Sequence, residues 1–517
     1  GTAAVINVTE NMIFDGQVDA NKAESVSLAA AGTLNGATVQ AGNASEVVIS
    51  EVGEDATLGL IADDAEQLTV TAAADLDLTA GGNTALSSLQ VLDAEIDGKL
   101  TVGALEAINT VNLEGTGEAD LGLLGAADQD GYGITVNAGS LSDTDTDNDD
   151  DALTINGIST EGTNIAVNAA GVLDGVNITA SLNANNGATT AGNVTVDVSS
   201  VGGDIVLSGA DARNITVDAS GALGTLNTGT LTGAAVTVNG GELGSNTVAV
   251  NASKSVNLSG GIENDGITLT DSTAADAKLS GSIDGGLGTD SLTFGSAADL
   301  TGVTVSNIET FDVDGNDVTL NASVVSGSDA TIDDTATGGS LILEGTSGAD
   351  TIDLSGLTNN ASIQVNGSAG EDTITASAGD DVFTYTDLNQ IGDTVSDFNA
   401  SGTDSVELAA SEFVLGTSDS VSAQSAGTLA SAVTFSGTDA AAFLSSTGNG
   451  LAVGSFAVMF LDTSGDDAGL YYITGDVATA AVTGAPPAEA VYNSSNIEEL
   501  IVTGAANQIA AADIVLV

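Results

Sequence analysis

Gly345-Thr-Ser-Gly-Ala-Asp350-Thr-Ile-Asp353 opens a series of three related nonapeptides. The second is Gly367-Ser-Ala-Gly-Glu-Asp372-Thr-Ile-Thr375, and Ala376-Ser-Ala-Gly-Asp-Asp381-Val-Phe-Thr384 follows it directly. A stricter copy lies upstream, Gly285-Gly-Leu-Gly-Thr-Asp290-Ser-Leu-Thr293. Apart from Ala376, all four read Gly-x-x-Gly-x-Asp-x-apolar-x. A glycine turn followed by a short strand with one inward apolar residue, repeated in this way, predicts a coil of parallel strands.

The glycines and aspartates of these nonapeptides suit a hard cation. Glycine reaches backbone angles closed to other residues, so a tight turn can point its carbonyls at an ion. The aspartate adds a carboxylate oxygen, the ligand type that Ca²⁺ prefers. We therefore expect calcium at these turns, although ordinary Gly-Asp turns are the alternative in a chain with 66 glycines. The candidate metal residues are Gly285, Gly286, Gly288, Asp290, Gly345, Gly348, Asp350, Gly367, Gly370, Asp372, Gly379 and Asp381.

The spacing of the motifs predicts which of them share an ion. Successive nonapeptides turn on alternate sides of a roll, so an ion should lie between turns about 18 residues apart. Asp372 and Asp381 should therefore lie on opposite sides. Asp350 and Asp372 can share a side if residues 357–360 bulge out. The following segment offers two partners for Asp381, namely Asp393 and Asp397.

A second acidic segment runs Asp143-Thr-Asp145-Thr-Asp147-Asn-Asp149-Asp-Asp151. Its alternate carboxylates resemble the start of an EF-hand loop, but Asn148 replaces the glycine and Thr154 replaces the final glutamate. The segment is therefore not an EF-hand. Two interpretations stay open: a loop-type calcium site built by Asp143, Asp145 and Asp147, or a solvated acidic loop.

The charge balance points to the same counter-ion. Seventy-two acidic residues face five basic ones, a formal net charge of −67, and the last basic residue is Lys278. Such a chain repels itself when compact unless cations neutralise it. The sign also excludes nucleic acid and anionic membranes as direct partners. Halophile-like surface acidity is the alternative explanation of the charge.

Most of the chain up to about position 400 alternates Val, Ile, Leu or Thr with small polar residues, which predicts strands with one buried face. Val196, Val217 and Val238 are each 21 residues apart, a spacing that suits one rung of a β-solenoid. The interval drifts elsewhere, to 31 between Val136 and Val167, so insertions should loop out. We predict an all-β fold, a right-handed parallel β-solenoid or β-roll. An array of β-sandwiches is the competing architecture.

Four segments are expected along the chain. Residues 1–135 and 136–284 form the N-terminal and central solenoid segments, 285–400 the calcium-binding roll, and 401–517 a small β-rich cap that closes its open end. Within the cap we expect two short helices, at 422–433 and 438–446, and two strands, at 453–461 and 470–474.

Catalysis has few groups to work with. The chain has no histidine to act as a general base and no cysteine to act as a nucleophile. A carboxylate pair can serve a glycosidase, but five tyrosines and no tryptophan offer few platforms for sugar rings. We therefore do not expect an enzyme.

The nonapeptides make the chain resemble the RTX proteins that type I secretion exports. Asp393-Thr-Val-Ser-Asp397-Phe, followed by Asp404-Ser-Val-Glu-Leu408, is similar to the segment that closes many RTX rolls. The apolar end Ile514-Val-Leu-Val517 is similar to the uncleaved export signals of that pathway. The resemblance therefore implies a type I secretion signal within residues 401–517.

A narrower resemblance is to the calcium-dependent bacterial surface-layer (S-layer) proteins. It rests on the stretch from Gly285 through Gly302-Val-Thr-Val-Ser-Asn-Ile-Glu309 to Val318-Thr-Leu-Asn321, and on the cysteine-free solenoid before it. It implies calcium-driven folding outside the cell and assembly into a lattice on outer-membrane lipopolysaccharide. Such proteins usually carry a separate N-terminal anchoring domain, for which nothing here matches. Because Gly1 is the first residue, we expect only the lattice-forming part.

The sequence thus predicts a structural S-layer protein at the bacterial cell surface, which folds and self-assembles into an extracellular lattice when it binds calcium. The alternative is an RTX adhesin or a subunit of an extracellular matrix filament. A lattice protein should form sheets on its own, whereas an adhesin should stay monomeric and bind a surface or sugar.

Overall fold

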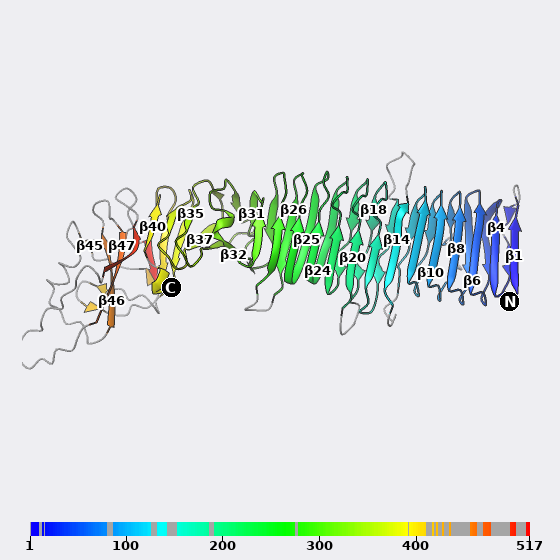
Figure 1. Ribbon diagram of the computed structural model, residues 1–517, viewed down its shortest axis with the longest axis horizontal. Coiled ribbons are helices and arrows are strands. Elements are labelled where there is room, and N and C mark those ends of the chain that lie inside the picture. The colour runs from blue at the N-terminus through cyan, green and yellow to red at the C-terminus, as the bar shows by residue number, and fades with distance from the viewer. Residues whose placement is uncertain are drawn as a thin grey trace, which may run out of the picture. The chain divides into compact units, whose positions relative to one another are not determined.

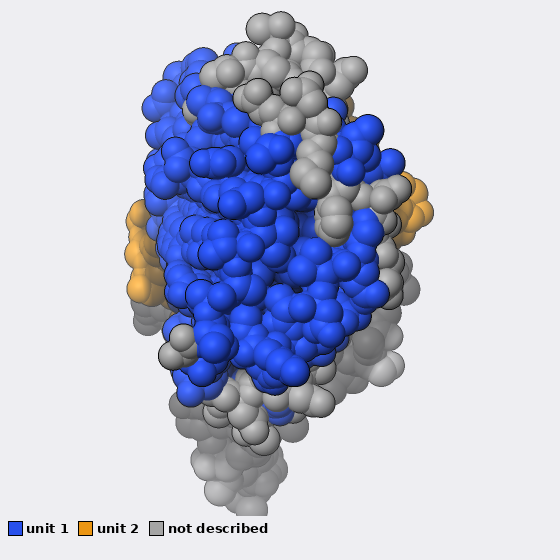
Figure 2. Space-filling view, turned by 90° about the vertical axis from the view of Figure 1, so that its right-hand side faces the viewer, with its two compact units in different colours: residues 1–292, 302–308 blue, residues 293–301, 309–517 orange. Residues whose placement is uncertain are grey.

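The computed structural model describes residues 2–9, 13–14, 16–79, 86–125, 132–141, 152–185, 191–273, 278–390 and 392–409, and several strands beyond them. The described part is all-β, with helix only in the 3-10 turns Ala322–Val324 and Leu388–Gln390. Its parallel strands stack as a right-handed β-solenoid of about 17 turns, which confirms the predicted fold. The chain divides into two compact units: unit 1 is residues 1–292 and 302–308, and unit 2 is residues 293–301 and 309–517 (Figure 2). Among the described residues, no helix is long and apolar enough to cross a membrane.

Unit 1 is built on one long ladder of parallel strands, which we call the main ladder (Figure 1). In order of pairing it contains β1 (Ala3–Val8), β4 (Ser25–Ala30), β6 (Glu46–Val52), β8 (Gln67–Ala72), β10 (Val91–Ile96), β12 (Thr110–Gly115), β14 (Ile134–Leu141), β17 (Ile165–Asn168), β20 (Asn193–Asp197), β23 (Asn214–Asp218), β24 (Leu226–Asn239), β25 (Asn246–Ser259), β27 (Ser280–Asp284) and β30 (Val303–Ser306).

Further ladders complete each rung of unit 1. The second contains β3 (Gln17–Asp19), β5 (Thr33–Gln40), β7 (Ala56–Ile61), β9 (Leu76–Asp77), β11 (Leu100–Val102), β13 (Ala119–Leu121), β15 (Leu153–Ile155), β18 (Val176–Ile178) and β21 (Ile205–Leu207), then the first halves of β24 and β25, and β26 (Gly266–Asp271). A shorter one contains β16 (Ile158–Ser159), β19 (Leu182–Asn183) and β22 (Ala210–Asp211).

The registers explain the regular and the irregular spacings of the sequence. Val196 pairs with Val217, and Val217 with Val238, so the 21-residue rung is confirmed. Val136 pairs directly with Val167 although 31 residues separate them. The extra length therefore leaves the ladder itself intact, as predicted for a looped-out insertion.

The glycine that ends β12 shows how closely the rungs stack. Gly115 has a φ of +120°, and a Cβ at this position would lie 1.9 Å from the carbonyl oxygen of Ile96 on the rung below. Only glycine tolerates both the left-handed backbone and the close approach.

Gly115→Ala is therefore expected to lower the free energy of unfolding by on the order of 3 kcal/mol, because strain and a backbone clash add. Thermal and denaturant unfolding of the variant measure the change. Gly36→Ala is the matched control: Gly36 has a φ of +67°, but a Cβ at this position would meet no atom within 4 Å, so the variant carries the strain without the clash. Equal losses in the two variants would contradict the close-packing argument.

Among the described residues, three parallel ladders build the roll of unit 2. The first contains β29 (Ala298–Asp299), β32 (Asp317–Asn321), β34 (Ser340–Glu344), β37 (Ser362–Asn366), β39 (Asp381–Tyr385), β41 (Ser405–Leu408) and β49 (Ile514–Leu516). The second contains β35 (Thr351–Asp353), β38 (Thr373–Thr375), β40 (Asp393–Ser396) and β48 (Ile497–Val502). The third contains β31 (Thr310–Asp312), β33 (Thr331–Asp333) and β36 (Thr358–Asn359).

The C-terminal strands extend the roll. β49 pairs with β41 and β48 with β40. β47 (Gly469–Asp476) pairs antiparallel with β48, and β46 (Ser455–Asp462) pairs antiparallel with β47. The strands predicted at 453–461 and 470–474 are therefore confirmed. The helix predicted at 422–433 is wrong, because Gly427–Thr428 within it forms strand β44, which pairs with β49. The helix predicted at 438–446 lies outside the described residues.

Candidate metal centre

One column of carboxylates lies at the start of the second ladder of unit 2. Asp350 and Asp372 directly precede β35 and β38, and Asp393 begins β40. Oδ1 of Asp372 accepts the backbone N–H of Asp350 at 2.8 Å, and Oδ1 of Asp393 accepts that of Asp372 at 2.9 Å. The prediction that Asp350 and Asp372 share a side is confirmed. The predicted bulge at 357–360 is wrong, because Thr358 and Asn359 within it form strand β36 of an additional ladder.

A second column lies on the first ladder of unit 2. Asp381 begins β39, on a different sheet from Asp372, as its nine-residue spacing predicts. Oδ1 of Asp404 accepts the N–H of Asp381 at 3.0 Å. The prediction that Asp381 pairs with Asp393 or Asp397 is wrong, because Asp381 pairs with Asp404 instead. Asp393 belongs to the other column. Sequence reasoning missed Asp404, although Gly402-Thr-Asp404-Ser-Val repeats the second half of the nonapeptide.

A third column lies in unit 1 and gives Asp290 a partner that the sequence pattern did not reveal. Oδ1 of Asp290 accepts the N–H of Asp265 at 2.7 Å, and Oδ1 of Asp265 accepts the N–H of Asn246 at 2.6 Å. A sequence signal for this partner was nevertheless present. Gly260 lies five residues before Asp265, as Gly285 lies five residues before Asp290.

Most of these carboxylates also close their own turn. Oδ2 of Asp350, Asp381 and Asp404 accepts a backbone N–H from four or five residues earlier, at 2.6–2.7 Å. Asp372 differs, because the N–H of Ser368 donates instead to Oδ1 of Asn366 at 3.0 Å. Oδ2 of Asp372 is buried and has no hydrogen-bond partner in the described structure.

The motif glycines lie against these carboxylates. A Cβ at Gly367 would lie 2.2 Å from Oδ2 of Asp372, and one at Gly345 would lie 2.2 Å from the carbonyl oxygen of Gly367. The φ angles of Gly286, Gly288 and Gly370 lie between +97° and +150°. The other five motif glycines, Gly285, Gly345, Gly348, Gly367 and Gly379, are not among the glycines with positive φ. A Cβ at Gly379 would clash with the side chain of Asn359, whereas one at Gly348 would meet no atom closer than 4.0 Å.

Burial makes the carboxylates of unit 2 hard to ionise. Asp372, Asp381, Asp393 and Asp404 are each at most 1% exposed. Burial raises the pKa of Asp381 and of Asp393 to about 7, and it also raises the pKa of Asp372 and Asp404. The hydroxyl of Tyr385 donates to Oδ2 of Asp393 at 2.9 Å. Because the chain has no lysine or arginine after Lys278, no basic side chain of the roll itself can balance these charges.

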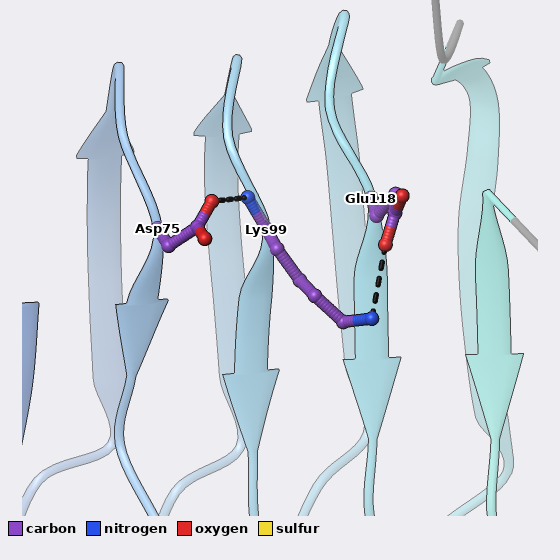
Figure 3. Close-up of polar contacts among 3 residues, drawn as sticks. All are labelled: Asp75, Lys99 and Glu118. Carbon is purple, nitrogen blue, oxygen red and sulfur yellow. Dashed lines mark hydrogen bonds and ion pairs between the residues drawn. The ribbon is translucent and has the colours of Figure 1, made fainter. Parts of the chain in front are cut away.

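Unit 1 contains the contrasting case of a compensated carboxylate. Nζ of Lys99 lies 3.0 Å from Oε2 of Glu118, whose side chain is 12% exposed, and the N–H of Lys99 donates to Oδ1 of Asp75 (Figure 3). The ion pair joins two successive rungs, so a cationic side chain does here what a bound cation would do in unit 2.

Lys99→Met is expected to lower the free energy of unfolding by about 1 kcal/mol, because Glu118 keeps its charge and loses its partner while Lys99 itself is 40% exposed. Chemical unfolding measures the loss. Lys22→Met, at an exposed site, should change stability by less than about half of that amount. A Lys99→Met protein as stable as the parent would mean that the pair contributes nothing.

The donor set fits Ca²⁺. Calcium takes 6–8 oxygen ligands, including backbone carbonyls, and the turns offer carboxylates, glycine carbonyls and one buried carboxylate oxygen without a partner, on Asp372. Among the described residues, no three acidic side chains converge as a metal cluster. Carbonyl oxygens would therefore have to supply most ligands of any ion. The predicted site at Asp143, Asp145 and Asp147 lies outside the described residues.

In comparisons with known proteins, no family model, curated protein or solved structure matches the chain. The chemistry of the turns and the charge of the chain are therefore what bears on the function. In unit 2, buried carboxylates are stacked along the solenoid in a region that contains no basic residue.

Proposed function

We propose that the protein is a calcium-dependent structural protein of a bacterial surface layer, which folds outside the cell and assembles with copies of itself. One observation carries the proposal: the roll of unit 2 buries four carboxylates beside glycine turns in a region without a single basic residue. Burying an ionised carboxylate is unfavourable unless a cation or proton compensates it. Divalent calcium compensates two carboxylates at once.

Three pairs of residues would hold the ions. Asp350 with Asp372, and Asp381 with Asp404, supply carboxylates in unit 2, and Asp265 with Asp290 does so in unit 1. The carbonyls of the neighbouring glycine turns would complete each ligand set. Calcium supplies positive charge to these turns when bound.

The expected affinity sets where the protein folds. Extracellular calcium modules bind with a Kd of about 10⁻⁴–10⁻³ M. Since binding energy is folding energy in such sites, the chain would stay loose in a calcium-poor cytosol and fold after type I export. Calcium would also bridge acidic surfaces of neighbouring copies, because surfaces of like charge repel without an ion between them. The surface that carries the assembly would be outer-membrane lipopolysaccharide. We assign the protein no catalytic role.

A calcium titration of the chelated protein tests the proposal, with far-UV circular dichroism and negative-stain images taken from the same samples. The proposal expects β-signal and ordered sheets to appear together with calcium. Calcium-dependent folding without sheets favours the adhesin or filament subunit instead. A protein that is fully folded in chelator and does not change when calcium is added would contradict calcium-dependent folding. Halophile-like surface acidity would then be the reason for the charge.

A further inference from the structure

Two motif aspartates of unit 2 have both carboxylate oxygens engaged within their own turn. Oδ2 of Asp350 accepts the backbone N–H of Thr346 at 2.6 Å, and the hydroxyl of Thr346 donates to Oδ1 of Asp350 at 3.1 Å. Ser377 donates to Asp381 in the same two ways, at 2.7 Å and 2.9 Å. We call these two turns closed, because the residue four positions earlier occupies both oxygens.

The turn of Asp372 is open by comparison. The N–H of Ser368, four residues before Asp372, donates instead to Oδ1 of Asn366 at 3.0 Å. Ser368 has a left-handed φ of +68°, which a serine rarely adopts. Asp372 is 1% exposed, and its Oδ2 has no hydrogen-bond partner in the described structure. A Cβ at Gly367 would lie 2.2 Å from this oxygen, so the oxygen faces the glycine turn.

Two further side chains hold Asn366 in its orientation. Nδ2 of Asn366 donates to Oε2 of Glu344 at 3.3 Å, and the two residues are register partners of β34 and β37. Nε2 of Gln390 donates to Oδ1 of Asn366 at 3.2 Å. Because a carboxylate only accepts hydrogen bonds, Glu344 draws the amide nitrogen of Asn366 toward itself and leaves the amide oxygen for Ser368.

The residue that precedes each nonapeptide separates the open turn from the closed ones. Asn and Asp side chains are short enough to accept the N–H two residues further on, which forms an Asx turn. Asn366 holds this place before the open turn, whereas Glu344 and Thr375 hold it before the two closed turns. Asp284 precedes the nonapeptide of unit 1, and it likewise accepts the N–H of Gly286 at 3.2 Å. An Asx residue at this place therefore takes the N–H that the motif aspartate otherwise accepts.

We propose that the site of Asp350 and Asp372 binds calcium before the site of Asp381 and Asp404, and that Asn366 is the positioning residue that sets this order. The order rests on the calcium binding proposed above and adds regulation to it. The roll would respond to calcium in two steps, at two different concentrations, rather than in one.

The two sites differ in what an ion must displace. At the second site, Oδ2 of Asp381 and Oδ2 of Asp404 each accept a backbone N–H of their own turn. A cation there has to share oxygens that are already in use. At the first site, the folded chain already carries a buried acceptor without a donor on Asp372. A bound ion removes that cost, which favours binding at the first site.

Isothermal titration calorimetry of the full chain with calcium tests the order. Asp372→Asn should remove the ion of the first site from the titration, and Asp404→Asn that of the second site. In the parent protein, the Kd of the first ion should be lower by about tenfold or more. Asn366→Thr places at the open turn the residue type that precedes the closed turn of Asp381. The N–H of Ser368 should then return to Asp372, which raises the Kd of the first ion about tenfold and leaves that of the second unchanged.

Two variants separate this role from a merely structural one. Asn321→Thr makes the same exchange on the same ladder, in the register row of Glu344 and Asn366, but no nonapeptide follows it. It should titrate as the parent does. Asn366→Asp keeps the short acceptor for Ser368, as Asp284 does for Gly286. It should therefore keep the preference for the first site, although it loses the hydrogen bond to Glu344.

The outcomes distinguish the order from the calcium binding on which it rests. Equal Kd values for the two ions in the parent, or a reversed order, would overturn the role of the open turn and leave calcium-dependent folding standing. An Asn366→Thr protein that titrates like the parent would do the same. If far-UV circular dichroism shows that this variant does not fold at saturating calcium, the two Kd values of the parent and of Asn366→Asp decide. A parent protein that takes up no calcium would overturn both proposals.

Discussion

Asp372→Ala combined with Asp381→Ala is expected to abolish the calcium-induced ordering of unit 2. The two side chains belong to different columns, so the double variant removes one carboxylate from each of the two calcium sites proposed in unit 2. It also removes the acceptors for the backbone N–H groups of Asp350 and Ser377. Each buried donor left without a partner costs about 1–3 kcal/mol. The gain in far-UV β-signal during a calcium titration measures the effect.

The acidic loop supplies the matched comparison. Asp143→Ala with Asp145→Ala removes the same number of charges from a segment that belongs to none of the three columns. If the columns control folding, the calcium-induced gain in far-UV β-signal of this variant should differ from that of the parent by less than about a fifth. An equal loss in both double variants would mean that the folding switch lies elsewhere.

The stability of the chelated protein is expected to fall as the pH rises from about 4 to about 7. Burial raises the pKa of Asp381 and of Asp393 from 3.8 to about 7 in the folded chain. The folded state then holds protons that the unfolded state has released. Their stabilising effect is complete below pH 3.8 and is lost as the pH passes 7. Each group contributes on the order of 4 kcal/mol to this change.

Melting temperatures in chelator across this pH range test the prediction, and calcium should restore the melting temperature at pH 7.5. Asp381→Asn with Asp393→Asn removes the two groups whose pKa is raised to about 7 and keeps an oxygen for the backbone N–H bonds. In chelator the melting temperature of this variant should therefore depend less on pH than that of the parent, in which these two groups titrate in addition to Asp372 and Asp404. A parent protein whose melting temperature stays constant would show that the buried carboxylates remain ionised without help.

Together these experiments separate the two roles of the aspartates. As acceptors, they join successive turns and close their own turn, which needs only an oxygen. As ionisable groups, they carry a negative charge that a bound cation must balance, unless a proton neutralises it. The alanine variants remove both roles, whereas the asparagine variants remove only the second. A calcium-dependent protein should therefore lose its calcium response at the Asp381–Asp404 site in both sets but keep its fold in the asparagine set.

The sequence alone determined the architecture because strand periodicity and glycine turns are local properties. Alternation of apolar and small polar residues decides which face of a strand is buried, whatever lies next to it. The 21-residue interval from Val196 to Val217 and Val238 then decided the length of a rung, and the structure pairs these residues in that register. The division of Asp372 and Asp381 between two sheets followed from their spacing in the same way.

Only the tertiary structure decided which turns stack on one another. Insertions change the number of residues per rung without changing the ladder, so separation along the chain does not reveal spatial neighbours. Asp404 and Asp265 were therefore not predicted as partners, although they stack on Asp381 and Asp290.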